Sequence, residues 1–246
     1  AYINQIKIHK KQTFDEILEI EKEIINQQDL NINFNLEKVK KLSEITDAFR
    51  DFFQSKLKVI SDRLTNDERK DLLEESQEME NKRQEVRDLI HLYPLILLNK
   101  KGEELVKEID NLFVYSLKGQ ITESELYFKE FEEKLANWKE NYSKVMNTET
   151  VGELSSNGIE QYYELKEKVE EKINSFDSRE VEIKRAKEFF KVLSTSSEIP
   201  LVTLQEKLGF EELNDLELWL VELGSIPVSY THLRAHETSL HLVCRL

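Results

Sequence analysis

The chain has 246 residues and carries 49 acidic against 35 basic side chains, a formal net charge of −14. This balance argues against general binding to the phosphate backbone of nucleic acids or to an anionic membrane surface, because both rely on accumulated Lys and Arg. With 6 glycines and 3 prolines, the composition also argues against an enzyme rich in irregular active-site loops, and it indicates long α-helices.

The first part of the chain predicts two helices joined by a short polar link. Thr13-Phe-Asp-Glu16 has the form of a capping box, in which a hydroxyl and a carboxylate satisfy free backbone N–H groups, and it predicts a helix from Thr13 to about Gln28. An asparagine-rich link follows at residues 30–35. Apolar residues then recur at steps of three and four, which predicts a second helix over Leu36–Leu64.

A second capping box, Thr65-Asn-Asp-Glu68, predicts the start of a third helix that extends to about Asn99. Apolar residues along it are spaced seven apart, at Leu72, Met79, Val86 and Tyr93. The stretch between Glu74 and Glu85 is almost wholly polar, so we expect a long hairpin that is exposed midway. Leu72, Met79 and Val86 are therefore candidate partner-binding residues.

Pro94 lies in the apolar stretch at residues 89–98, which would anchor this hairpin. Proline removes a backbone donor and clashes with the preceding turn, so Pro94 should kink the third helix or end it just before. A separate helix is expected over Glu103–Leu117.

A third capping box, Thr122-Glu-Ser-Glu125, opens the clearest apolar stripe of the chain. Its members are Phe128, Phe131, Leu135, Trp138, Tyr142 and Val145. Four aromatic residues at these positions fit a globular bundle better than a regular two-stranded coiled coil. Residues 148–158 form the best internal break, and a further helix is expected over Ile159–Phe176.

The segment from Ser178 to Ile226 has a different texture. It predicts a helix over Arg179–Ser194, an interruption at Ile199-Pro200, and a short helix that ends at Gly209, a residue that tolerates a left-handed cap. The next helix is expected over Leu213–Leu223.

This order of helix, extended bridge, short helix, tight turn and helix resembles the start of a winged-helix domain. Ile199-Pro-Leu-x-x-Leu-x-x-x-Leu-Gly-Phe210 is a common form of the helix-turn-helix in such domains. A helical body followed by an acidic winged helix is similar to a PCI-type module, the scaffold of proteasome-lid, signalosome and translation-initiation complexes. That resemblance implies a non-catalytic assembly role, in which the winged helix pairs with partner subunits. The long, unequal helices of this chain depart from the short stacked pairs of that family.

Contact with DNA would require a reading helix that presents Arg, Lys, Asn or Gln to the groove. From Leu208 to Ile226 there is no Lys or Arg. The acidic residues of this stretch are Glu211, Glu212, Asp215, Glu217 and Glu222. We therefore expect contact with protein rather than DNA. The candidate partner-binding residues of this segment are Leu213, Leu216, Trp219 and Leu220.

The last nineteen residues, Val228 to Leu246, resemble a translated sequencing adapter. Val228-Ser-Tyr-Thr-His-Leu-Arg-Ala-His-Glu-Thr238 matches a transposase-type adapter, and Leu242-Val-Cys-Arg-Leu246 matches the constant stretch that follows its variable index. The resemblance implies a non-native tail over residues 227–246, which is excluded from reasoning about the fold. Together with the start at Ala1, it predicts that the chain is an internal fragment.

The tail contains the residues that would otherwise indicate a zinc site, namely His232, His236, His241 and Cys244. Outside it, the histidines are His9 and His91, and a hydrogen-bonded structural role is the simpler interpretation for His91. Neighbouring carboxylates such as Glu74 and Glu75 point to different sides of a helix, so solvated faces explain them. We therefore predict no catalytic, cofactor-binding or metal-binding residue and no small-molecule substrate.

Taken together, the patterns predict an all-α protein. Residues 1–177 would form a long-helix bundle or antiparallel coiled-coil hairpin with a break at 148–158, and residues 178–226 a truncated winged-helix-like segment. The predicted function is a non-enzymatic cytoplasmic scaffold or adaptor, without a cofactor, that binds a protein partner or self-associates through its helices. The alternatives are a coiled-coil dimeric transcriptional regulator with a winged-helix DNA-binding domain, or the helical arm of a larger enzyme. No apolar run approaches the ~20 residues of a membrane span.

Overall fold

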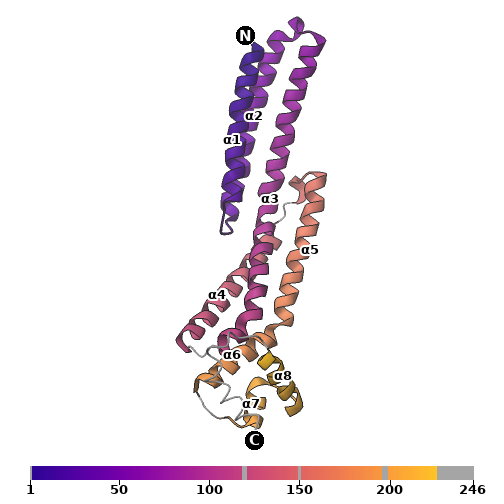
Figure 1. Cartoon of the computed structure of the whole chain (residues 1–246). Helices are drawn as coiled ribbons and strands as arrows, with labels where there is room; N and C mark the ends of the chain where they lie inside the picture. The colour runs from indigo at the N-terminus through magenta and orange to yellow at the C-terminus, as the bar shows by residue number, and fades with distance from the viewer. Residues whose placement is uncertain (1, 118–120, 149–150, 196–198, 226–246) are drawn as a thin grey trace. The chain divides into compact units, whose positions relative to one another are not determined.

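The computed structural model describes residues 2–117, 121–148, 151–195 and 199–225 (Figure 1). Within these ranges the chain forms eight α-helices and two short 3₁₀ helices and contains no strand, which confirms the all-α prediction. The elements are α1 (Tyr2–Ile25), α2 (Ile32–Ile60), η1 (Ser61–Arg63), α3 (Asn66–Leu117), α4 (Ile121–Met146), η2 (Val151–Glu153), α5 (Ser156–Ser178), α6 (Glu180–Thr195), α7 (Leu201–Leu208) and α8 (Leu213–Ser225). The tail that resembles an adapter lies outside the described residues.

The chain divides into two compact units, each built from two stretches of sequence. Unit 1 contains Ala1–Lys100 and Asn141–Val169, and unit 2 contains Lys101–Glu140 and Glu170–Leu246. Helices α3, α4 and α5 each contribute one part to each unit. Residues on both sides of the boundary expected at residue 178 belong to unit 2.

In unit 1, α1, α2 and the first half of α3 lie side by side as a helical bundle (Figure 1). Each helix turns one apolar stripe inward, as the spacing of three and four requires. The buried core consists of Ile6, Ile17, Ile20, Ile24, Leu42, Phe49, Phe53, Ile60, Leu72, Met79, Val86 and Ile90. Ion pairs such as Lys82 Nζ to Glu21 Oε2, at 2.9 Å, join the outer edges of α1 and α3.

The capping box predicted at Thr13 is wrong. Helix α1 begins at Tyr2, and Thr13 is buried in its middle, where its hydroxyl donates to the carbonyl of His9 at 3.0 Å. Ile6, which precedes the supposed cap, already belongs to the buried stripe, so tertiary packing extends the helix upstream. The next helix also begins earlier than predicted, because the Asn31 side chain caps α2 by accepting from the Phe34 N–H at 3.0 Å.

The capping box at Thr65 is confirmed. The Glu68 N–H donates to Thr65 Oγ1 at 3.2 Å, and the Thr65 N–H donates to Glu68 Oε2 at 3.0 Å, which is the reciprocal arrangement that the motif requires. The box predicted at Thr122 lies outside the described side chains.

The predicted end of the third helix, just before Pro94 or at about Asn99, and the separate helix over residues 103–117 are wrong, because α3 is continuous from Asn66 to Leu117. Pro94 has no N–H to give to the carbonyl of Ile90, one turn earlier. The Asn35 side chain of α2 supplies a donor instead, with Nδ2 3.4 Å from the Ile90 oxygen. Burial of neighbouring apolar residues such as Leu95 and Leu98 further stabilises the helix through this position.

Unit 2 has an aromatic core, as the stripe in α4 predicts. Phe131 and Trp138 of α4 are buried, and the indole of Trp138 meets the ring of Phe176 edge to face at 4.9 Å. Gly102 of α3 packs on the same indole, since a Cβ at this position would lie 3.3 Å from it.

The end of unit 2 follows the predicted order of α6, α7, turn and α8. Gly209 adopts the left-handed conformation (φ 68°) that ends α7. Arg185 of α6 completes this end, because its guanidinium donates to the carbonyls of Leu208 and Gly209 at 3.1 and 3.2 Å and lies 4.0 Å from the centre of the Phe210 ring.

Candidate functional site

The candidate partner-binding residues of α3 lie in the core of unit 1. Leu72, Met79 and Val86 are 1%, 3% and 0% exposed and pack against the apolar stripes of α1 and α2. The polar stretch between them is the outer face of α3, and their seven-residue spacing marks the buried face. Partner binding through these three residues stays a prediction, and the structure gives their side chains a packing role within the chain.

The candidate residues of α8 face the helices of unit 2. Leu216 and Leu220 are buried. Trp219 is half-buried and packs edge to face on Phe189 of α6 at 5.3 Å, and Leu213 is half-buried at the start of the helix. These contacts hold α8 in place and turn its other side outward.

The outward side of α8, which we call the α8 face, consists of Asp215, Glu217, Leu218, Val221 and Glu222. Leu218 and Val221 are 57% and 69% exposed and lie one turn apart, so they form one apolar strip. Carboxylates flank the strip on both sides. Within the part of the chain that the structure describes, Asp215 and Glu217 have no ion-pair partner, and neither do Glu211 and Glu212 just before the helix.

The α8 face escaped the sequence prediction because Leu218 and Val221 fall between the positions of the buried stripe. The signal that could have found them is the presence of extra apolar residues on the polar side of an amphipathic helix.

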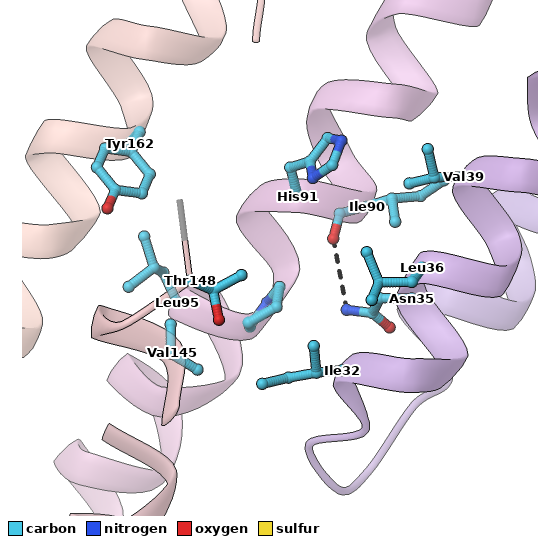
Figure 2. Close-up of a pocket in the computed structure, with 11 residues that line it drawn as sticks. Ile32, Asn35, Leu36, Val39, Ile90, His91, Leu95, Val145, Thr148 and Tyr162 are labelled. Atoms are coloured by element: carbon cyan, nitrogen blue, oxygen red, sulfur yellow. Dashed lines mark hydrogen bonds between the residues drawn. The ribbon is translucent and has the colours of Figure 1, made fainter. Parts of the chain in front are cut away.

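Unit 1 contains a small groove lined by α2, α3, the end of α4 and α5 (Figure 2). Its lining is mostly apolar, with Val39 from α2, Leu95 from α3, Val145 from α4 and Tyr162 from α5 as examples. The cavity volume of about 40 Å³ gives room for a few water-sized groups, since one water needs roughly 10–15 Å³. This is too little space to enclose a typical small-molecule ligand.

A polar cluster lies beside this groove, where α3 holds the connection into α5. We call it the α3 latch and define it as Arg87, Asp88 and His91 of α3 with Glu153 and Ser155. Asp88 accepts from the Ser155 N–H at 3.0 Å and also from the Ser155 hydroxyl. The Ser155 hydroxyl oxygen in turn accepts from the N–H of Gly158 at 3.0 Å, which caps the first turn of α5.

Glycine at position 158 permits this approach. A Cβ there would lie 2.7 Å from Asp88 Oδ2, closer than unbonded atoms can come without displacement. Gly158, predicted as part of a break, therefore has a packing role in the first turn of the helix.

The second half of the latch is electrostatic. Arg87 Nη2 donates to Glu153 Oε2 at 2.9 Å, and this hydrogen bond lowers the pKa of the Glu153 carboxyl. Nε2 of His91 lies 3.1 Å from the same oxygen, without the alignment of a good hydrogen bond. Burial lowers the pKa of His91 against the opposite pull of Glu153, and the positive charge of Arg87 lowers it further. His91 is therefore neutral at pH 7. The hydrogen-bonded structural role expected for it stays a prediction, because its buried Nε2 has no hydrogen-bond partner among the described residues.

No protein-family model, curated protein or solved structure matches this chain. Among the residues that the structure describes, no helix combines the length and apolar character that crossing a membrane requires. Over the same residues, no group of three or more His, Cys, Asp or Glu side chains is placed to hold a metal ion.

Proposed function

We propose that this protein is a non-enzymatic, cytoplasmic helical adaptor that binds a protein partner through the α8 face. The observation that carries the proposal is the exposed apolar strip of Leu218 and Val221, with Asp215 and Glu217 beside it as carboxylates that have no ion-pair partner among the described residues. An apolar strip with a charged rim is the usual composition of a protein interface.

The charge of this surface defines the chemistry of the partner. From Leu208 to Ile226 the sequence contains acidic residues and no Lys or Arg. No basic residue of this segment therefore neutralises the negative charge of α8. Contact with a second copy of the same face, or with DNA phosphates, would bring like charges together. A basic segment with apolar residues between its Lys and Arg side chains would pack on the apolar strip and form ion pairs with the carboxylates that flank it.

We further infer that α6, α7 and α8 are the helical part of a winged helix of the PCI type. Support comes from the order of the three helices and from the left-handed Gly209 in the turn after α7. In this interpretation α8 has the position of the recognition helix, and its acidic outer face suits protein better than DNA.

Binding of a synthetic amphipathic Leu–Lys helix tests the proposal directly, with a Leu–Glu helix of the same pattern as the control peptide. Fluorescence anisotropy should show binding of the Leu–Lys helix and no binding of the Leu–Glu helix. The affinity should fall as the salt concentration rises, because salt screens exposed charges. Replacing the strip residue, Leu218→Ser, should weaken binding about tenfold.

Leu73→Ser is the matched control variant, because Leu73 of α3 is 54% exposed and Leu218 is 57% exposed. Equal losses in the two variants would show that the peptide binds acidic protein surface without using α8. Tight binding of duplex DNA by the unmodified protein would contradict the adaptor proposal and favour a DNA-binding regulator.

A further inference from the structure

Hydrogen bonds and an ion pair connect residues 153–155, just before α5, to α3. Within residues 151–155, Leu154 is the buried apolar residue, while Glu153 and Ser155 are tied to α3 through Arg87 and Asp88. The polar part of this attachment consists of hydrogen bonds and an ion pair, whose strength depends on protonation.

His91 occupies the buried centre of this attachment. Its side chain is 6% exposed, whereas that of Glu153 is 50% exposed. A proton on His91 would place a positive charge out of contact with water and beside the guanidinium of Arg87, which already bonds the same carboxylate oxygen. Hydrating the charged ring requires the covering segment to move away from α3.

We propose that the contacts between α3 and residues 151–158 form a pH-sensitive latch, which opens when His91 takes up a proton. The closed form disfavours the imidazolium because it is desolvated, and the open form hydrates it. A ligand that binds one of two states more tightly shifts the population toward that state, and here the ligand is the proton.

The charged groups around His91 determine the direction of the response. Glu153 of η2 and Asp88 of α3 favour the imidazolium, while burial and Arg87 disfavour it, and burial is the largest effect. The groove residues that α2 and the end of α4 present beside the ring carry no charge, and the titratable group from α5 is the Tyr162 phenol. Because the net effect lowers the pKa of His91, acidification favours the open form.

Opening the latch would change the groove beside it. His91 and Leu95 of α3 line this groove, and Tyr162 of α5 lines its opposite wall (Figure 2). Release of the α5 start would separate these walls and expose their apolar lining. The latch would thus convert a drop in pH into a new apolar surface on unit 1.

Nuclear magnetic resonance of the full chain tests the proposal. The ring protons of His91 give its titration, and hydrogen exchange at the Ser155 and Gly158 amides, corrected for the intrinsic effect of pH, gives the opening. We expect His91 to titrate below 6.5, its ordinary value. Protection of the two amides should fall over the same pH range, by up to about tenfold for each unit by which the pKa is lowered.

His91→Gln should remove the pH dependence of this protection, and His9→Gln should leave it unchanged. His9 is the matched control because its ring packs on Phe52 of α2, at 4.4 Å, away from the latch. Amide protection that stays constant while His91 titrates would overturn the proposal, and so would an unchanged pH response in His91→Gln. If that variant does not fold, the titration of the unmodified protein still decides.

Discussion

The pairing of Pro94 with Asn35 makes a quantitative prediction about how α3 stays continuous. Pro94 leaves the Ile90 carbonyl without its helical donor, and Asn35 Nδ2 supplies a substitute at 3.4 Å. Proline within a helix costs about 3 kcal/mol. The bond from Asn35 offsets about 1 kcal/mol of this, and the stiffness that proline gives the unfolded chain offsets about 0.4–1 kcal/mol. Pro94→Ala should therefore stabilise unit 1 by about 1–2 kcal/mol.

The two residues should also be coupled. Asn35→Leu leaves a buried carbonyl without a donor, at a cost of about 1–3 kcal/mol. In the Pro94→Ala background the new N–H of residue 94 bonds the Ile90 carbonyl, so the same substitution should cost about 1–2 kcal/mol less. The Asn35 oxygen has no hydrogen-bond partner among the described residues, but this affects both backgrounds equally and cancels in the cycle.

Native-state hydrogen exchange of core amides such as those of Val86 and Ile90 is the suitable assay. The chain has two units, so one denaturation curve would mix their unfolding. Pro200→Ala is the control, because Pro200 lies at the N-cap of α7 and blocks no helical bond. A destabilising Pro94→Ala, or a coupling energy below about 0.5 kcal/mol, would refute the reasoning.

Three further predictions concern glycine and histidine. Gly158→Ala should destabilise unit 1 by about 1–3 kcal/mol in the same exchange assay, because its Cβ would meet Asp88, whereas Gly152→Ala, with no atom within 4 Å of the added Cβ, should have little effect. Gly209→Ala should lower the stability of unit 2 by about 1 kcal/mol, measured by exchange in α7, because φ there is 68°. The stability of unit 1 should decline as pH falls below 6.5, since the unfolded chain then binds a proton at His91 that the folded chain resists. His91→Gln should flatten this decline, measured by hydrogen exchange of the unit 1 core amides at several pH values.

Local sequence signals predicted the elements whose causes are local. The Thr65 capping box needs only residues within one turn, and the end of α7 needs only a glycine at position 209. The aromatic stripe of α4 likewise follows from its spacing, which places Phe131 and Trp138 on one buried face.

The sequence predictions that were wrong or incomplete depend on contacts between residues far apart in sequence. Asn35, which lets α3 pass through Pro94, precedes Ile90 by 55 residues, and the latch joins Asp88 to Ser155 across 67 residues. Thr13 has a valid capping pattern, but the burial of Ile6 determines that the helix begins earlier. No window of local sequence contains these causes, so propensity and periodicity could not predict them.

Apolar periodicity is a poor guide to partner surfaces, because the fold buries the residues that repeat. A regular stripe is the part of a helix that the fold buries, and Leu72, Met79, Val86, Leu216 and Leu220 are all buried. Single exposed apolar residues are common on protein surfaces, but two that lie off the stripe and one turn apart form a continuous apolar strip outside that core. Leu218 and Val221 meet this criterion, and the carboxylates of Asp215 and Glu217 lie on the same outward face. Position relative to the buried stripe, rather than hydrophobicity alone, is therefore the better basis for predicting a partner surface on this protein.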